Sequence, residues 1–485
     1  MPSARRLLLP NLKLTNLAEE ISSEASKVLI PATKMSVLTT YHTVPKLIHL
    51  HSTPNRSAPL KIPLCLKLFP LVVGRDGVPW AEANMWLLSK AQETYAPSMT
   101  TIASNADDLA SYLRFIEETN IEWTIFEANK LTRPTYRYYS HLKQLIANNE
   151  VAHSTARRRM SSVIRFYKWL KLDGYLKFDY EPWKESERII FFTDLRGFIK
   201  NNKVVTTDIS IKNQIIDDPY DDFINDGGKL RALTQYEQQC ILNALIEINN
   251  TEMTLIHLFS LLTGARLQSI LTFQVHHVLR ITEMDAQDTM RFAIGPGTGI
   301  DTKNDKKMVL HIPVWFYKLL QDYAVSHRAK KRRNRAVGGD NEEQYLFLSI
   351  RGTPLYYNKS DSTGARDKAN KHHNKVGQAV RQFIIEKIIP YLKENNDGAT
   401  FLYRFHDLRA AFGMNLMDSQ LALVEQGTIT LKHAIEFVKN RMSHESITTT
   451  ERYLNYRYQK KMIRAAQDGW EAEIFRIATR GASND

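Results

Sequence analysis

An acidic, turn-rich segment near the middle of the chain most strongly constrains how this sequence can fold. Residues 201–228 include the runs 217–222 (DDPYDD) and 225–228 (NDGG), and they show no apolar periodicity. Clusters of Asp, Asn, Gly and Pro without periodicity are typical of loops and linkers. A chain of 485 residues is also too long for one ordinary core. We therefore expect a linker at 201–228, with one domain at 86–200 and another at 229–485.

The first 85 residues have mixed character and are predicted to form an N-terminal extension of unknown role. The stretch 60–73 is apolar and β-like, and Gly74-Arg75-Asp76-Gly77 is typical of a turn. This pattern indicates a small accessory region, and it leaves open whether the region takes part in binding.

The region 86–200 is predicted to be a small helical domain. Apolar residues recur at helical spacing in 109–116, 138–145 and 160–170, and Pro134 suits the first turn of the second helix. The third helix also carries cations outside its apolar stripe, at Arg157, Arg158, Arg159, Arg165 and Lys168. A cationic helix face can lie along a phosphate backbone. A solvated helix face explains the same pattern, and both interpretations remain open.

The second domain begins with a clear helix start. Thr234 and Glu237 form a capping box, in which the two side chains satisfy free backbone N–H groups. Further along, two strand-like runs at 290–294 and 308–312 flank a polar turn. The domain is therefore expected to be mainly helical with a small β-sheet.

The charge balance favours a polyanionic partner. Lys and Arg number 65 against 52 acidic residues, a formal net charge of +13, and nucleic acid is the commonest polyanion. The densest basic run, 328–335, is expected to be a helix end or loop; it could contact DNA, act as a nuclear-import signal, or be solvated. The two cysteines, Cys65 and Cys240, predict reduced thiols and a cytoplasmic protein. No uncharged stretch reaches the ~20 residues of a membrane span, so no membrane partner is expected.

Four short segments of the second domain stand out together. They are 262–270 (LTGARLQSI), 301–307 (DTKNDKK), 406–412 (HDLRAAF) and 442–453 (MSHESITTTERY). The first places an arginine after a Thr-Gly break in an apolar helix. The second places lysines in the turn between the two strand-like runs. The third and fourth add histidines, a second arginine and a tyrosine.

In this order the segments resemble the catalytic domain of tyrosine recombinases, the phage-integrase family. That family has a Thr-Gly-x-Arg motif, a hairpin lysine, a His-x-x-Arg motif, a Gly-His motif, and a tyrosine nine residues after that last histidine. The matching residues are Arg266, Lys303, His406, Arg409, His444 and Tyr453. The resemblance covers about 229–460, and more loosely 90–195, which looks like the family's SAM-like helical core-binding domain. It implies an α+β fold, mainly α with a small sheet.

The resemblance implies cleavage of DNA through a covalent 3′-phosphotyrosine. Tyr453 is the nucleophile, and Arg266 and Arg409 offer paired, charge-assisted hydrogen bonds to the phosphate oxygens. Preorganised donors of this kind contribute a few kcal/mol each. The covalent link conserves the bond energy, so religation needs no ATP. The sequence also lacks a Walker motif, an acidic two-metal cluster and zinc-ligand spacing, so no cofactor is expected.

The remaining matched residues have implied roles in proton transfer and phosphate binding. His406 is the candidate proton acceptor, since a free phenol has a pKa of about 10. His444 is expected to bond the scissile phosphate, and Lys303 to protonate the leaving 5′ oxygen. Lys306 and Lys307 compete with Lys303 within the same turn, and Tyr456 and Tyr458 compete with Tyr453.

The sequence departs from the family pattern at two positions. Ser443 stands where the family often has Gly before the histidine, and this is expected to change loop geometry only. Ser269 stands where the family often has an acid three residues after the first arginine. The second change removes a carboxylate that could orient neighbouring groups, so their support is expected to differ.

The implied function is site-specific strand exchange between two DNA duplexes, as an integrase or transposon recombinase. The implied partner is double-stranded DNA, bound by a homo-tetramer on two sites with a dimer on each. A type IB topoisomerase and a non-catalytic DNA-binding regulator derived from an integrase are the alternatives. After Tyr453 the apolar positions of 462–477 predict an amphipathic helix, which could pack on its own domain or on a neighbouring subunit.

Overall fold

The computed structural model describes residues 3–14, 64–93, 98–193, 199–212, 223–279, 289–359, 376–395 and 401–481. These residues fall into two units, one holding the described residues up to 212 and the other holding those from 223 onward. Most of the described residues are helical, and the strands form small two-stranded antiparallel sheets. The predicted fold class is therefore confirmed. Within the described residues, no helix combines the length and apolar character needed to cross a membrane.

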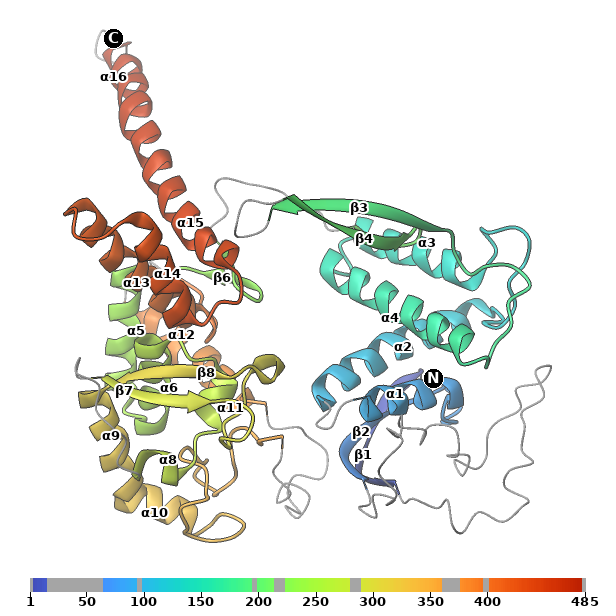
Figure 1. Cartoon of the computed structure of the whole chain (residues 1–485), viewed down its shortest axis with the longest axis horizontal. Helices are drawn as coiled ribbons and strands as arrows, with labels where there is room; N and C mark the ends of the chain where they lie inside the picture. The colour runs from blue at the N-terminus through green and yellow to red at the C-terminus, as the bar shows by residue number, and fades with distance from the viewer. Residues whose placement is uncertain are drawn as a thin grey trace. The chain divides into compact units, whose positions relative to one another are not determined.

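The first unit contains four helices and two antiparallel pairs of strands among its described residues (Figure 1). Its elements are β1 (Arg5–Leu14), β2 (Leu64–Val73), α1 (Ala81–Gln92), α2 (Met99–Thr119), α3 (Pro134–Ala147), α4 (His153–Leu172), β3 (Glu185–Thr193) and β4 (Ile199–Thr207). Strands β1 and β2 pair antiparallel, as do β3 and β4. The predicted helices at 109–116, 138–145 and 160–170 lie within α2, α3 and α4, and Pro134 begins α3.

The core of this unit follows the predicted apolar stripes. In α4, Met160, Val163, Tyr167 and Leu170 are all fully buried. The Tyr167 hydroxyl lies 2.7 Å from that of Tyr112 on α2, so the one polar atom of each ring has a partner inside the core.

The N-terminal strands share the core of the helical unit. Leu66 and Phe69 of β2 are buried in the same apolar cluster as α2 and α4. The predicted boundary at residue 85 therefore does not separate two cores in the structure. The reason is that a two-stranded sheet cannot bury its apolar face alone and needs a helix against it.

The division between the two units falls within 201–228, where a linker was predicted, but most of the described residues of this segment lie in hairpins. Residues 201–207 belong to β4, and Asp226 lies in the turn of a hairpin formed by β5 (Phe223–Asn225) and β6 (Lys229–Arg231). Residues 213–222 lie outside the described residues. Turn-forming composition is shared by linkers and tight hairpins, and the sequence pattern alone does not separate the two.

The second unit is mainly helical, and its described residues include two small two-stranded sheets (Figure 1). After β5 and β6, its elements are α5 (Gln235–Ile248), α6 (Thr251–Thr263), α7 (Leu267–Leu271), α8 (Val275–Leu279), β7 (Thr289–Ile294), η3 (Lys303–Asp305), β8 (Met308–Pro313), α9 (Val314–Val325), α10 (His327–Arg333), α11 (Gln378–Phe383), η6 (Ile384–Ile388), α12 (Ile389–Asn395), α13 (Asp407–Glu425), α14 (Leu431–Met442), α15 (Ile447–Ala466), η7 (Gln467–Glu471) and α16 (Ala472–Gly481).

Two local predictions for this unit are confirmed. The capping box is complete, because Thr234 accepts from the Glu237 backbone N–H and Glu237 accepts from that of Thr234. Strands β7 and β8 pair antiparallel, with the lysine-bearing turn between them. A separate apolar cluster formed by α13, α14, α15 and the β5–β6 hairpin contains Tyr453.

The C-terminal helix exposes its apolar residues in the single chain. Met462 is 70% exposed, Trp470 69% and Phe475 70%. Met462 and Trp470 belong to the stripe that the sequence analysis predicted, whereas Phe475 does not. The described part of the same chain therefore does not bury this stripe.

Candidate active site

Side chains from separate segments of the second unit converge on the carboxylate of Asp226. The short β5–β6 hairpin holds this buried residue at its turn, where the Asp226 N–H donates to the Gly228 carbonyl at 3.0 Å. Oδ2 of Asp226 accepts from Arg409 Nε at 2.9 Å and from the Tyr453 hydroxyl at 3.1 Å. His444 Nε2 lies 3.3 Å from the same oxygen. One anionic oxygen is therefore shared by three of the predicted site residues.

Arg409 connects the segments around this carboxylate. It lies on α13, one turn after His406, and its side chain is 1% exposed. Nη1 donates to the Gly264 carbonyl at 2.6 Å and Nη2 to the Met442 carbonyl at 2.8 Å. Arg409 thus ties together the turn before Arg266 and the end of the helix before His444. The sequence analysis assigned the guanidinium of Arg409 to a phosphate, but in the structure its two terminal nitrogens donate to backbone carbonyls.

Arg266 lies beside the same carboxylate with an uncommitted donor. It precedes α7, and its Nη2 is 3.6 Å from Oδ1 of Asp226. Its Nε is buried and has no hydrogen-bond partner among the described residues. A buried N–H without a partner is costly, so this atom is suited to an anion that enters the site.

The Thr-Gly turn before Arg266 requires glycine. Gly264 ends α6 with φ +67°, and a Cβ there would lie 2.6 Å from Cδ1 of Phe412. Both the left-handed backbone and the contact with α13 exclude a side chain. The Thr-Gly-x-Arg pattern is therefore explained by the backbone path that turns Arg266 toward Asp226.

His444 and Tyr453 lie against each other. Their ring centroids are 5.7 Å apart and their planes differ by 30°. His444 Nδ1 is 2.9 Å from the Thr450 hydroxyl, on the same helix as Tyr453. Because an ionised carboxylate only accepts, Nε2 of His444 carries the proton toward Asp226, and Nδ1 accepts from Thr450.

The ring of Tyr453 packs against Gly413 of α13, where there is no room for a side chain. A Cβ at Gly413 would lie 2.5 Å from Cε1 of Tyr453. Tyr453 is fully buried, whereas Tyr458, one of its competitors in the sequence, is 44% exposed. Of these two tyrosines, only Tyr453 donates to Asp226.

The charges of the site change the acid–base properties of its members. Burial would raise the pKa of Asp226, but the hydrogen bond from His444 and the charge of Arg409 hold it well below its ordinary value. Burial and the Asp226 charge raise the pKa of Tyr453. Burial lowers the pKa of Arg266 to about 10, and the Arg409 charge acts in the same direction. The site in this state therefore holds an ionised carboxylate and a protonated phenol.

His406 lies at the start of α13 in the same electrostatic environment. Burial lowers its pKa to about 4, with further lowering by Arg266 and Arg409. It is neutral near pH 7 and can accept a proton. The Tyr453 hydroxyl, however, donates to Asp226 rather than to His406, the acceptor expected from the sequence.

The hairpin lysines occupy different places. Nζ of Lys303 lies 3.0 Å from the position that a Cβ on Gly227 would take, next to Asp226. Lys306 instead donates to the Ser443 carbonyl at 2.7 Å and lies 3.8 Å from Glu445. Lys303 is therefore beside the carboxylate turn, and Lys306 anchors the β7–β8 hairpin to the turn before His444.

The two departures from the family pattern have structural explanations. Ser269 is buried, and its hydroxyl donates to the Asp301 carbonyl at 2.8 Å, which fastens α7 to the end of the β7–β8 region. Ser443 ends α14 in the left-handed conformation at φ +52° and ψ +44°. Glycine adopts this backbone conformation without a steric cost, whereas serine adopts it under strain.

Replacing Ser443 by glycine is expected to stabilise the protein. The left-handed conformation costs a residue with a Cβ about 1 kcal/mol or more, and glycine avoids this cost. The bonds of Ser443 to Asn440 and Lys306 use backbone atoms and survive the change. Urea unfolding should show a gain of about 1 kcal/mol. Asn249→Gly is the matched control, since asparagine tolerates φ +53° and should gain less; an equal or larger gain there contradicts the argument.

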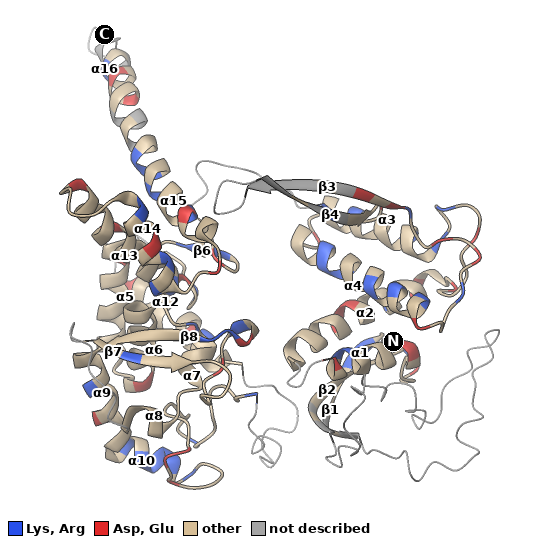
Figure 2. Ribbon diagram, viewed as in Figure 1, with Lys and Arg blue, Asp and Glu red and all other residues tan. Residues whose placement is uncertain are grey.

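The cations of α4 are partly engaged within the first unit. Figure 2 shows Lys and Arg along this helix. Arg158 pairs with Asp108 at 3.1 Å, Lys168 pairs with Glu185 at 3.1 Å, and Arg165 donates to Asn105 at 3.3 Å. Arg157 is exposed, with no hydrogen bond or ion pair among the described residues, and Arg159 is half-buried. The described contacts of this helix leave its predicted role open.

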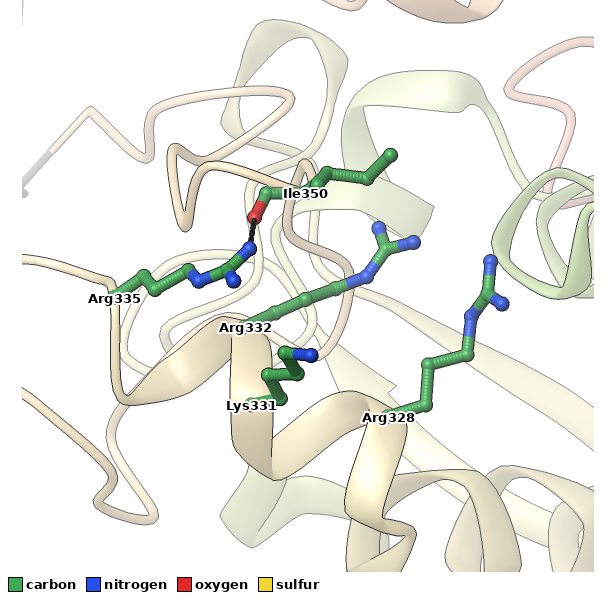
Figure 3. A pocket seen from close by; sticks show the side chains of 5 residues that line it. All are labelled: Arg328, Lys331, Arg332, Arg335 and Ile350. Atoms are coloured by element: carbon green, nitrogen blue, oxygen red, sulfur yellow. Dashed lines mark hydrogen bonds between the residues drawn. The ribbon is translucent and has the colours of Figure 1, made fainter.

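The densest basic run forms α10 and the turn after it, where the sequence predicted a helix end or loop. Arg328, Lys331, Arg332, Arg335 and Ile350 line a cavity of about 350 Å³ (Figure 3). Arg328 and Arg332 each lie 2.8 Å from the buried Glu252 carboxylate. Arg335 donates to the Ile350 carbonyl at 2.8 Å. Much of this positive charge therefore has a structural role in the second unit.

Sequence reasoning missed Asp226, the residue at the centre of the site. Its acidic, glycine-rich surroundings indicated a linker. A signal was present, because Asn-Asp-Gly-Gly is a hairpin turn sequence and the capping box follows within a few residues. Nothing in the local pattern, however, indicates that this turn folds onto α13 and α15.

Comparison with known proteins finds similarity at the level of fold. No family model matches the sequence, and no curated protein matches it. The XerH site-specific recombinase bound to difH substrate has a TM-score of 0.41 and 12% identity, over 80% of this chain and 83% of that one. The Tn1549 transposon integrase in complex with a circular intermediate DNA has a TM-score of 0.43 and 10% identity, over 76% and 93%. A lambda integrase dimer bound to a COC′ core site has a TM-score of 0.41 and 11% identity, over 77% and 94%. At low sequence identity, the chain is similar in fold to these tyrosine recombinases.

Proposed function

We propose that this chain is a site-specific DNA recombinase of the tyrosine type, which cuts and rejoins DNA through Tyr453. One observation carries the proposal: Arg266, Arg409, His444 and Tyr453 surround a single bound anion, the carboxylate of Asp226. The site is thus built to hold a negative charge against a phenolic hydroxyl. A DNA phosphate diester is an anion that such a nucleophile can attack.

The proposed step is a transesterification at phosphorus. The Tyr453 oxygen forms a bond to phosphorus, and the bond from phosphorus to the 5′ oxygen breaks. The phenolic proton passes to His406, and Lys303 supplies a proton to the leaving 5′ oxygen. Arg266, whose Nε has no hydrogen-bond partner in the described part of the chain, meets the charge that develops on the non-bridging oxygens. Religation reverses the same steps with a 5′ hydroxyl as the nucleophile.

The proposal includes DNA contact outside this site. The exposed cations of α4, with Arg157 the freest of them, suit the phosphate backbone of the duplex. The proposed contact also includes Arg158, Arg159, Arg165 and Lys168 of the same helix. We also propose that the protein acts in the cytoplasm, where the buried free thiol of Cys240 stays reduced.

A covalent trap tests the proposal without knowledge of the target sequence. Nicked duplexes with a randomised region, in which cleavage releases a short fragment, are incubated with the full chain. A denaturing gel then detects protein–DNA adducts, and sequencing of the trapped DNA reveals the preferred site. Failure of the wild-type chain to form any adduct would overturn the enzymatic function and favour a DNA-binding regulator. Relaxation of plasmids that lack the recovered site would favour a type IB topoisomerase.

The exposed stripe of the C-terminal helix is proposed to dock on a second copy of the chain. Replacing Met462, Trp470 and Ile477 by serine should change the free energy of unfolding by no more than about 0.5 kcal/mol, because these side chains are exposed. Self-association on DNA should weaken by about 10-fold or more, since a buried Trp is a strong interface anchor. Sedimentation of protein–DNA complexes measures the effect.

A matched control uses apolar residues exposed elsewhere in the second unit. Trp315 and Leu319 on α9 are 53% and 43% exposed, and their replacement by serine should not change self-association. A loss of folding stability of several kcal/mol in the C-terminal variant would show instead that the helix packs on its own domain.

A further inference from the structure

The carboxylate of Asp226 occupies the place that the proposed function reserves for a phosphate. Its side chain is 4% exposed, and its Oδ2 contacts Arg409 at 2.9 Å, Tyr453 at 3.1 Å and His444 at 3.3 Å. Oδ1 faces Arg266 at 3.6 Å. Each of these partners is one that a bound phosphate needs. A second anion brought to the same donors therefore competes with Asp226 for them.

Simultaneous occupancy is excluded by charge and by geometry. Two anions in a buried pocket repel strongly because little water screens them. The donors are also limited, since both Nη atoms of Arg409 already bond the Gly264 and Met442 carbonyls. Only Nε of Arg409 faces the anion, and Asp226 uses it. A phosphate that enters must therefore displace this carboxylate.

The alternative role for Asp226, as the base that takes the proton of Tyr453, fits the contacts poorly. The same Oδ2 that accepts from Tyr453 also accepts from Arg409 and lies within hydrogen-bond distance of His444. Donation from cationic and polar groups stabilises the ionised carboxylate and weakens it as a base. Asp226 is better suited to hold the phenol in its protonated state.

The backbone around Asp226 allows the carboxylate to leave. The strands on either side are three residues long, and Gly227 has φ +69°. Among the described residues, a Cβ on Gly228 would meet no atom within 4 Å, and one on Gly227 would meet only Nζ of Lys303. The turn therefore has open space beside it, while Ile224 and Leu230 anchor the strands in the apolar cluster.

The same hairpin is joined to the helix that carries the nucleophile. Arg452, next to Tyr453 in sequence, donates from Nη1 to the Asn225 carbonyl at 2.7 Å. Movement of the Asp226 turn and movement of α15 are thus mechanically linked. Loss of the Tyr453–Asp226 hydrogen bond also frees the phenolic oxygen for a new partner.

We propose that Asp226 is an internal substitute for the scissile phosphate, which positions Arg409, His444 and Tyr453 in the free protein and restrains the nucleophile until a DNA phosphate displaces it. The inference rests on the proposed function for the identity of the displacing anion. Asp226 acts through these residues and is a positioning residue, not a catalytic one. It gives the free enzyme an ordered but inactive site.

Inorganic phosphate tests the competition without any DNA chemistry. Its dissociation constant is measured by titration calorimetry on the full chain, at constant ionic strength because anion binding is screened by salt. Asp226→Asn keeps the shape of the side chain and removes its charge. The variant should bind phosphate at least about 10-fold more tightly than the wild type.

Glu445→Gln is the matched control, since this exposed acid lies near Lys306 but does not contact Arg409. It should change phosphate affinity by less than about 2-fold. If Asp226→Asn binds phosphate equally or more weakly, the substitute role is wrong. If Asp226→Asn does not fold, Asp226→Ser replaces it in the same titration. Tighter phosphate binding by that variant supports the substitute role, and equal or weaker binding contradicts it.

Two further measurements separate this inference from the proposed function. In Asp226→Asn, covalent adduct formation on nicked DNA should start without the delay that displacement imposes on the wild type. Loss of the adduct with unchanged phosphate affinity would show that Asp226 is the base, and would overturn the substitute role. Tighter phosphate binding with no adduct in any variant would support the substitute role and overturn strand transfer.

Discussion

Tyr453→Phe should abolish covalent attachment to DNA while leaving the fold intact. The change removes one oxygen, and the Asp226 carboxylate keeps Arg409, Arg266 and His444 as partners. Loss of a nucleophile typically lowers the rate on the order of 10⁶-fold, so the adduct should fall below detection. The measurement is a denaturing gel of trapped adducts on nicked duplexes, with the unfolding transition recorded in parallel.

Tyr458→Phe is the matched control for that prediction. Tyr458 lies on the same helix and is 44% exposed, so the same chemical change falls outside the site. It should retain adduct formation within about 2-fold, as expected for a surface substitution away from the chemistry. If Tyr453→Phe still forms the adduct and Tyr458→Phe does not, the nucleophile has been assigned to the wrong tyrosine.

Arg409→Ala is expected to be the most destabilising single substitution in the site. Its guanidinium is 1% exposed, and its loss leaves the Gly264 and Met442 carbonyls unpaired and the Asp226 charge undercompensated. Breaking a buried charge pair on one side typically costs about 3–5 kcal/mol. Unfolding in urea, followed by tryptophan fluorescence, measures the loss.

Two comparisons isolate the reason for this cost. Arg409→Lys keeps the charge but cannot reach three acceptors in a planar fork, so it should also lose more than about 1–2 kcal/mol. Arg457→Ala removes an arginine whose Nε lies 2.9 Å from Oδ1 of Asp418, and the Asp418 side chain is about one-third exposed. This substitution should lower the free energy of unfolding by less than about 1 kcal/mol. Equal losses in Arg409→Ala and Arg457→Ala would show that Arg409 is not a structural clamp.

The structure changes how the two arginines are understood. From the sequence they formed a symmetric pair of phosphate ligands. In the structure both terminal nitrogens of Arg409 donate to backbone carbonyls, whereas Nε of Arg266 has no hydrogen-bond partner among the residues that the structure describes. The two side chains therefore differ in function within the proposed reaction: one assembles the site, and the other is free to follow the charge of the transition state.

Local features of the fold could be predicted because short-range chemistry decides them. The stripe on α4, Pro134 at the start of α3, and the capping box at Thr234 each depend on residues within one or two helical turns. The β7–β8 hairpin could be predicted for the same reason, because its two strands and its turn are consecutive in the sequence. The strands within 201–228 were not predicted because turn composition is local information, whereas the pairing of β5 with β6 and the packing of that hairpin are not.

The identity and order of the candidate site residues were determined by the sequence alone, since spaced motifs such as His-x-x-Arg specify residue types. Their arrangement around one anion was decided only by tertiary packing. Arg409 and Asp226 are 183 residues apart in the chain, and Tyr453 and Asp226 are 227 apart. No local pattern encodes contacts of that range, because they depend on how α13, α15 and a three-residue strand share one apolar cluster. The burial that brings these groups together is also what shifts their pKa values and makes Asp226 the centre of the site.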